Sequence, residues 1–243
     1  MNGSTQLTAA EVILNPKLNL QVIKVGVEQT PVIVIDDFLQ DVQPLIDDVA
    51  HTDAFADGQR TAYPGVRCSL PDTYIDKVLE YVRPKICSVY GMSSDIKPLG
   101  YYGLYSLVTT PEKELKTLQR VPHCDSRKQF YFAILHYLNP APHGGTGFYR
   151  HNPSGYERIN DERFHRYVMT AEAFMAQNGL PAARYYQADD GHFTLVDSVA
   201  YKPNRLLVYP GNLLHSGLID AQHDICADPV KGRLTANIFV AFD

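Results

Sequence analysis

A histidine and an aspartate two positions apart, His123 and Asp125, are the first side chains in the sequence that could bind a metal ion together. They stand in the segment LQRVPHCDS. In extended backbone, residues i and i+2 project to the same face, so this imidazole and carboxylate can reach one ion. A His-x-Asp triplet alone is a weak indication in a chain with 9 histidines. A second one, beginning at His51, ends a predicted helix, where i and i+2 diverge by about 200°, and we interpret it as a solvated helix end.

The segment RLLVYPGNLLHSGLI supplies a third candidate ligand, His215. It predicts a strand, a Pro-Gly turn and a second strand, and a histidine placed after such a turn can point into the mouth of a barrel. Two histidines and one carboxylate leave coordination positions open, as non-haem Fe(II) requires when it must bind a cosubstrate and oxygen. The alternative for His215 is a core histidine bonded to the backbone.

The segment GRLTANIFVAFD, near the end of the chain, alternates polar and apolar residues from Arg233 to Ile238. A strand with one polar and one apolar face is typical of the wall of a wet cavity. Arg233 could form a bidentate pair with a carboxylate there. The alternative is a surface arginine on an edge strand. The His-x-Asp pair, His215, the alternating strand and Arg233 are far less likely to occur together by chance in this order than any one of them is alone.

The elements around these residues predict a mainly β protein with flanking helices, arranged as a sandwich or barrel. Apolar residues at helical spacing predict helices at 41–50 and 71–90, and Pro84 should kink the second helix or end it early. A further helical insertion is predicted at about 160–178. Strands are predicted at 20–27, 31–36, 97–109, 130–138, 145–151, 192–200, 204–210, 213–219 and 233–242.

Without a linker or internal repeat, residues 1–243 are expected to form a single domain. Residues 1–96 would contribute N-terminal strands and supporting helices, and residues 97–243 the β core. Between the two predicted helices, YPGVR at 63–67 could form a lid over a pocket, although the simpler interpretation is that these side chains are solvated.

The net charge of −5 and the pI of about 6.0 give no electrostatic signature of nucleic-acid or membrane binding. We therefore expect a small-molecule or protein substrate. No apolar run reaches the roughly 18 residues that span a bilayer, and the N-terminus lacks a secretory pattern. The 4 cysteines are widely spaced without a CxxC pair, which favours a reducing cytoplasm.

With these motifs the chain resembles the Fe(II)/2-oxoglutarate-dependent dioxygenase superfamily, and within it the prolyl-hydroxylase-like branch. The ordered signature is HxD, a distal histidine and an arginine on the last core strand. The segment FYFAILHYLNPAPHGGTGFYRH is also similar to the family's strand that ends in Tyr-Leu-Asn before Gly-Gly. More narrowly, LQRVPHCDS, GGTGFYRH and YPGNLLHSG resemble a bacterial group of uncharacterised members, the DUF6445 type.

The resemblance implies a double-stranded β-helix, also called a jelly roll or cupin-like barrel, with Fe(II) held by His123, Asp125 and His215. It implies 2-oxoglutarate as cosubstrate, decarboxylated to succinate while the substrate is hydroxylated. Arg233 would bind the 5-carboxylate of 2-oxoglutarate, together with the Tyr137 hydroxyl and Thr235. The resemblance leaves open whether Tyr105 or Tyr102 contacts the 1-carboxylate.

Two features of the sequence bear on these roles. The gap between His215 and Arg233 is longer than usual in the family, which leaves Arg205 and Lys231 as alternatives to Arg233. Related halogenases lack the metal-binding carboxylate, so the presence of Asp125 favours oxygenation.

Two rival functions stay open: a non-catalytic cupin-like binding module, and a metal-dependent dioxygenase that does not use 2-oxoglutarate. A serine hydrolase is not supported, because no Gly-x-Ser-x-Gly motif occurs. The substrate is not specified by the sequence, and a homodimer is compatible with it.

Overall fold

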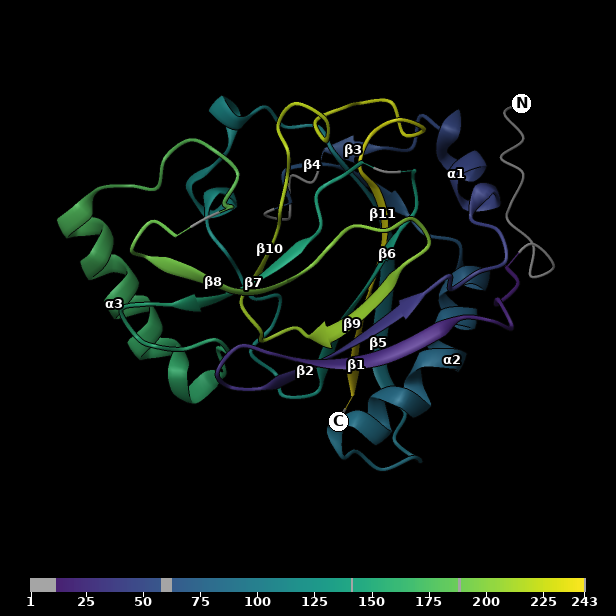
Figure 1. The fold of residues 1–243 in the computed structure, drawn as a ribbon, viewed down its shortest axis with the longest axis horizontal. Helices are drawn as coiled ribbons and strands as arrows, with labels where there is room; N and C mark the ends of the chain where they lie inside the picture. Colours follow the sequence, from purple (N-terminus) through teal and green to yellow (C-terminus); the bar gives the residue numbers. More distant parts are fainter. Residues whose placement is uncertain (1–11, 58–62, 141, 188, 243) are drawn as a thin grey trace.

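The computed structural model describes residues 12–57, 63–140, 142–187 and 189–242, and within them the fold is mainly antiparallel β. Eight strands form one sheet in the order β1-β2-β9-β6-β11-β5-β4-β3, and three form a second sheet in the order β10-β7-β8 (Figure 1). The two are separate sheets among these residues, and no closed barrel is formed.

The strands and helices have the following bounds along the chain. The strands are β1 (Asn19–Val25), β2 (Thr30–Asp36), β3 (Ala56–Asp57), β4 (Gly65–Ser69), β5 (Pro98–Val108), β6 (Tyr131–Tyr137), β7 (Thr146–His151), β8 (Phe193–Val199), β9 (Leu206–Pro210), β10 (His215–Gly217) and β11 (Leu234–Phe242). The helices are α1 (Gln43–Ala50), α2 (Asp72–Tyr90) and α3 (Asp161–Asn178), with 3-10 turns at Glu112–Glu114 and Thr117–Arg120.

The eight-stranded sheet is covered on both faces, and its strand alternation sorts the residues between them. Residues such as Ile134 and Ile238 face a core that α1 and α2 complete. Their neighbours in sequence, Ala133 and Phe239, face the other way and pack with Phe148 of the three-stranded sheet. Because both faces are buried, a shift of one residue in register would exchange the two environments.

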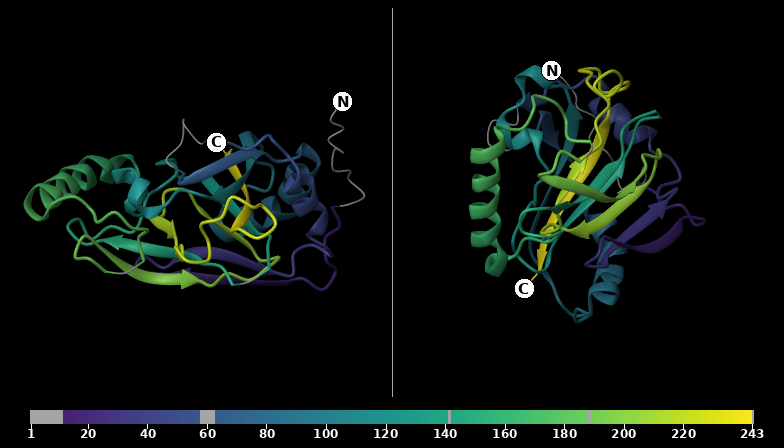
Figure 2. Two further views of the ribbon diagram at one scale, coloured as in Figure 1. Left: turned by 90° about the horizontal axis from the view of Figure 1, so that it is seen from above. Right: turned by 60° about the vertical axis from the view of Figure 1, so that its left-hand side comes forward.

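The helices lie at opposite ends of the molecule, α1 and α2 at one end and α3 at the other (Figures 1 and 2). Helix α2 continues through Pro84 to Tyr90 and ends before Gly91, which adopts a left-handed conformation. The expected early end is therefore not observed. A proline inside a helix costs about 3 kcal/mol, and α2 offsets this by burying an apolar stripe that includes Val78, Val82 and Ile86.

The predicted helical insertion at about 160–178 corresponds to α3. Asn160 caps its N-terminus, since the side-chain oxygen accepts a hydrogen bond from the backbone N–H of Arg163 at 3.0 Å. Helix α3 buries no residue completely. It therefore adds little to the two cores of the large sheet.

The segment YPGVR at 63–67, interpreted from the sequence as a lid or as solvated side chains, leads into and forms part of a strand, β4. β4 pairs with β5 along its whole length, from Gly65 opposite Val108 to Ser69 opposite Leu104. The N-terminal strands β1 and β2 belong to the same sheet as β9 and β6. The first third of the chain thus builds part of the main sheet and does more than support it.

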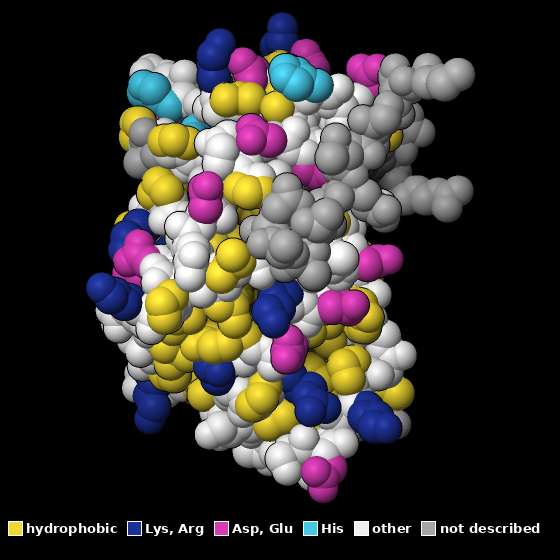
Figure 3. Space-filling view, turned by 90° about the vertical axis from the view of Figure 1, so that its right-hand side faces the viewer, with side chains coloured by type: hydrophobic (Ala, Val, Ile, Leu, Met, Phe, Trp, Pro, Cys, Tyr) yellow, Lys and Arg dark blue, Asp and Glu magenta, His cyan; other side chains and the backbone are white. Residues whose placement is uncertain are grey.

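The outer face beside α1 and α2 carries lysine, arginine and acidic side chains interspersed around hydrophobic ones (Figure 3). No large area of a single charge sign is visible on this face. Among the described residues, no helix has the length and apolar composition needed to cross a membrane. The four cysteines, all in the described ranges, are free thiols.

We expect Ile238→Ala to lower the free energy of unfolding by about 2–5 kcal/mol, because it removes methylene groups from a close-packed core. Ile238 is 1% exposed at the centre of β11. Val22→Ala on the edge strand β1, where the side chain is 44% exposed, should change stability by less than about 0.5 kcal/mol. Urea denaturation followed by circular dichroism measures both, and equal effects would contradict the assignment of this core.

Candidate metal centre

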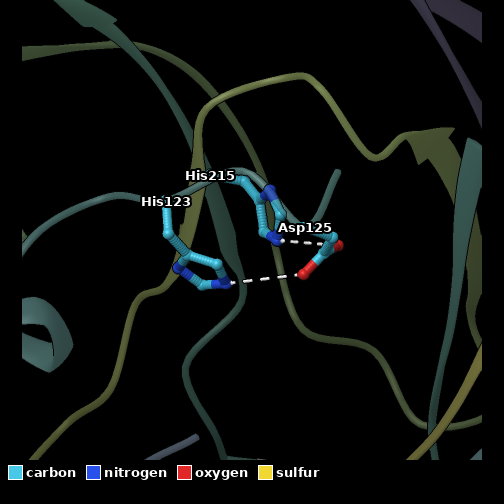
Figure 4. A group of neighbouring side chains, drawn as sticks. All are labelled: His123, Asp125 and His215. Atoms are coloured by element: carbon cyan, nitrogen blue, oxygen red, sulfur yellow. Dashed lines mark ion pairs between the residues drawn. The ribbon is translucent and has the colours of Figure 1, made fainter. Parts of the chain in front are cut away.

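Three side chains that are distant in sequence converge on one point. His123, Asp125 and His215 each present a ligand atom, and these atoms lie within 4.8 Å of one another. The Asp125 carboxylate faces both rings from one side, with Oδ1 3.7 Å from His123 Nε2 and Oδ2 3.6 Å from His215 Nε2 (Figure 4). This is the set of donors that the sequence predicted.

The backbone holds the two histidines side by side. His123 N–H donates to the His215 carbonyl and His215 N–H donates to the His123 carbonyl, both at 2.9 Å. Two residues further on, Asp125 N–H donates to the Gly211 carbonyl at 2.7 Å. The ligand segment is therefore paired to the turn before β10, and its extended conformation puts both side chains on one side.

Gly211 allows this close approach. A Cβ atom at this position would lie 2.5 Å from the ring of Tyr131, which is too close for any other residue without movement. The Gly211 N–H donates to the Tyr131 carbonyl at 2.7 Å. The Pro-Gly turn thus fixes β9, β6 and the metal-ligand segment relative to one another.

The protonation of the histidines suits a metal. His215 Nδ1 lies 2.8 Å from the Leu213 carbonyl oxygen, which can only accept a hydrogen bond, so Nδ1 carries the hydrogen and Nε2 keeps its lone pair for an ion. The pKa of His123 is lowered to about 4, first by burial of the ring and then by the neighbouring His215. The His123 ring is therefore neutral at pH 7, although half of its side chain is open to the cavity.

Asp125 gives an independent test of the fit. Its Oδ2 atom is buried and has no hydrogen-bond partner among the described residues. A buried carboxylate oxygen without a partner is costly. Two neutral imidazoles and this carboxylate satisfy the donor requirements of a divalent transition metal, which would also satisfy Oδ2.

The site opens into a cavity between the two sheets, with about 830 Å³ of free space counted out to its mouth. Its walls include residues of β4, β6, β7, β10 and β11. Arg233, Thr235 and Asn237 line the cavity as the alternation on β11 predicted.

Arg233 is 3% exposed, and hydrogen bonds to Gly144 and Gly145 orient its guanidinium. Its Nε donates to the Gly144 carbonyl at 2.7 Å, and its Nη2 to the Gly145 carbonyl at 3.1 Å. The guanidinium carbon lies 5.5 Å from the centre of the Tyr137 ring. The two alternatives to Arg233 are engaged elsewhere, because Arg205 forms a bidentate pair with Asp36 and Lys231 pairs with Asp228 at the surface.

Tyr137 lies beside Arg233, and its hydroxyl is 2.7 Å from Thr146 Oγ1. Burial raises the pKa of Tyr137, and the positive charge of Arg233 partly opposes this. The phenol therefore stays protonated and can act as a hydrogen-bond donor. Thr235 Oγ1 accepts from Asn237 Nδ2 at 2.9 Å.

Tyr105 is not brought to the cavity. It pairs with Ala236 across β5 and β11, so both face the helix-covered core, and its hydroxyl donates to Asp48 at 3.0 Å. The expectation that Tyr105 contacts the cosubstrate is therefore wrong, because its side chain lies on the opposite face of the sheet from the cavity. Tyr102 pairs with Phe239 and lies on the cavity face, where the two rings stack at 5.0 Å.

Two residues of the cavity were missed or undervalued from the sequence. Tyr209 lies on β9 with its ring 4.8 Å from that of His215, and its alternation with Val208 could have indicated its side. Arg67, in the segment expected as a lid or as solvated, lines the cavity from β4. Its position depends on the pairing of β4 with β5, which has no local signature.

The buried carboxylate of Asp224 helps to fix the Gly-Gly segment that orients Arg233. Asp224 accepts hydrogen bonds from His143 Nδ1 at 2.8 Å, Gly144 N–H at 3.0 Å and Asp220 N–H at 2.8 Å. A Cβ on Gly144 would be 1.5 Å from the Leu218 carbonyl oxygen, so only glycine fits between them. The long segment before Arg233 therefore folds back and fixes the carbonyl groups that orient it.

Comparison with known proteins places the chain in a family. Residues 16–240 match the family of unknown function DUF6445, and the chain belongs to it. No curated protein matches the sequence.

Among solved structures, the chain is similar to HygX from Streptomyces hygroscopicus with nickel and 2-oxoglutarate bound. The identity is 14%, with 88% of this chain and 84% of the other covered and a TM-score of 0.47. It is also similar to a novel N-substituted L-amino acid dioxygenase in complex with alpha-KG from Burkholderia ambifaria AMMD, at 14% identity, 94% coverage of both chains and a TM-score of 0.40.

We expect Asp224→Asn to lower the free energy of unfolding at pH 7 by about 3–5 kcal/mol, the usual cost of breaking a buried pair from one side. Burial raises the pKa of Asp224, but the bonds from His143 and the backbone outweigh this and leave it below its ordinary 3.8. Its stabilisation is therefore complete above pH 4 and is lost as the pH falls through the folded-state value.

Denaturation at several pH values checks this. The variant should lose less stability than the wild-type protein between pH 4 and pH 2. The control Asp228→Asn, which removes an exposed pair with Lys231, should leave stability at pH 7 unchanged. Parallel pH curves for the wild-type protein and Asp224→Asn would contradict the interpretation.

Proposed function

We propose that this protein is an Fe(II)- and 2-oxoglutarate-dependent oxygenase that hydroxylates a small-molecule or protein substrate. The observation that carries the proposal is the convergence of His123, Asp125 and His215 on one cavity that also holds the buried Arg233. Two imidazoles, one carboxylate and open positions suit non-haem Fe(II). A buried guanidinium in the same cavity suits the distal carboxylate of an oxo-diacid.

Each residue has a role that its contacts support. Fe(II) would supply oxygen activation, coupled to decarboxylation of 2-oxoglutarate to succinate. The two histidines bind as neutral imidazoles, and the Leu213 carbonyl keeps the tautomer of His215. Arg233 binds the 5-carboxylate. The Gly144 and Gly145 carbonyls already orient its guanidinium, so the side chain loses little conformational freedom on binding. Thr235 and the Tyr137 hydroxyl complete this end of the pocket.

We also propose that the two sheets are the major and minor sheets of a double-stranded β-helix, and that residues 1–243 form one domain. In support of this, His215 begins β10 of the smaller sheet directly after the turn that follows β9 of the larger sheet. Four free cysteines support a reducing compartment such as the cytoplasm. We propose a small-molecule or protein substrate as the partner, no nucleic-acid or membrane partner, and a homodimer as a compatible assembly.

Titration of the anaerobic, Fe(II)-loaded protein with 2-oxoglutarate tests the function. We expect a visible metal-to-ligand charge-transfer band and, on admission of oxygen, release of succinate. Asp125→Ala should weaken metal binding by at least about tenfold, whereas His51→Ala, from the other His-x-Asp triplet, should not. A folded, metal-loaded protein without the band would contradict the proposal. The band without succinate would favour a binding module.

Arg233→Gln should raise the Kd for 2-oxoglutarate by at least about tenfold, because a charged hydrogen-bonded contact is lost, while metal affinity is unchanged. Lys231→Gln is the matched control, since Lys231 is two residues away and exposed, and it should have no effect. Isothermal titration of anaerobic protein measures both. An unchanged Kd in Arg233→Gln would contradict the role of Arg233 in binding the 5-carboxylate, and wild-type protein that does not bind 2-oxoglutarate would support a dioxygenase that does not use it.

A further inference from the structure

A second arginine faces the cavity, and no part of the proposed cosubstrate site uses it. Arg67 on β4 pairs with Ser106 of β5, which pairs in turn with Thr235 of β11. Directly paired residues of an antiparallel sheet project to the same face. Arg67 therefore lies on the cavity face, two strand spacings or about 10 Å from Thr235.

Arg67 has no anionic partner in the described part of the chain. Its guanidinium carbon stacks 4.2 Å from the centre of the Tyr63 ring. Its Nε is buried without a hydrogen-bond partner, and no carboxylate lies within ion-pair distance of the group in the described ranges. Burial lowers the pKa of Arg67, opposed by Tyr63, Asp125 and Tyr102. An unpaired guanidinium in a cavity is costly unless a ligand pairs with it.

The carboxylates beside the cavity are engaged by groups other than Arg67. Asp125 faces the imidazoles of His123 and His215. Asp224, another buried carboxylate beside the cavity, is already engaged by His143 and two backbone N–H groups. The guanidinium of Arg67 is therefore left without a carboxylate partner among the described residues, and a monoanion such as a carboxylate could pair with it.

The cavity face of β5 and β11 is aromatic four residues along from Ser106 and Thr235, which lie in the same row as Arg67. Tyr102 stacks on Phe239, and the Tyr131 ring lies 6.3 Å from that of Phe239. Phe239 lines the cavity, and Tyr102 is 52% exposed. An apolar body attached to the anionic group would bury this surface.

We propose that Arg67 binds one carboxylate of the substrate through its guanidinium, with the apolar body of the substrate against Tyr102 and Phe239. This assignment rests on the proposed function and names the substrate class of the same site: a monocarboxylate with an apolar or aromatic chain. Arg67 is thus a specificity-determining residue, separate from the cosubstrate arginine.

Isothermal titration of anaerobic protein, loaded with Fe(II) and saturated with 2-oxoglutarate, tests the assignment. The probes are 3-phenylpropanoate, 4-phenylbutyrate and hexanoate, each compared with its neutral amide. At least one acid should bind the wild-type protein about tenfold or more tightly than its amide. Arg67→Gln should abolish this preference, change amide binding less than twofold and leave the Kd for 2-oxoglutarate within twofold of the wild-type value.

Two further variants keep the test decisive. Arg67→Lys retains the charge without the planar fork and should lower the affinity for the acid by about three- to tenfold. Arg166→Gln, on the exposed face of α3, should behave as the wild-type protein. Melting temperatures recorded for every variant separate loss of binding from loss of folding, and Arg67→Lys serves if Arg67→Gln does not fold.

Three results would overturn the assignment: no acid preferred over its amide by the wild-type protein, a preference undiminished in both Arg67 variants, or a weakened Kd for 2-oxoglutarate with acid binding unchanged. The charge-transfer band of the wild-type protein is recorded first. Its absence contradicts the proposed function and this assignment together, whereas its presence with any of the three results contradicts the role of Arg67 alone.

Discussion

The reciprocal hydrogen bonds between the backbones of His123 and His215 are the constraint on which the site depends. They join a segment before β6 to one after β9, across more than a third of the chain, and bring two imidazoles to a ring-centre separation of 4.5 Å. The same pairing lets the Gly211 carbonyl accept a hydrogen bond from the Asp125 N–H. The carboxylate is thereby placed by backbone bonds, which need no help from a metal to form.

The large sheet separates two environments that the function requires. On one face of β11, Leu234, Ala236 and Ile238 complete a dry core with α1 and α2. On the other, Arg233, Thr235 and Asn237 line the cavity. A rigid, doubly covered strand holds polar groups more precisely than a loop can. The cost is a set of buried polar atoms whose partners must come from neighbouring strands, turns or ligands.

The segment between β10 and β11 shows how an unusual sequence gap can be structural. It returns Asp224 to the Gly144–Gly145 turn, and the carbonyl groups of this turn in turn orient Arg233. The negative charge of Asp224 also lies close enough to Arg233 for each to stabilise the other. The longer spacing before Arg233 therefore provides a buried support for this arginine rather than an argument against it.

Local patterns in the chain were enough to identify much of this architecture. The His-x-Asp pair, the Pro-Gly turn before His215 and the alternation from Arg233 to Ile238 each depend on side-chain periodicity, which near neighbours in sequence define. Most strands and all three helices follow from the same periodicity.

Tertiary structure decided what periodicity cannot express. Tyr102 and Tyr105 are three residues apart in one strand, so the sequence shows only that their side chains point to opposite faces. Which of them faces the cavity depends on the register of β5 against β11. The strand at β4, and with it the exposure of Arg67 to the cavity, exists because β5 offers an edge to pair with. The continuation of α2 past Pro84 is likewise set by burial of its apolar stripe, a contact with distant strands that outweighs the local preference to break.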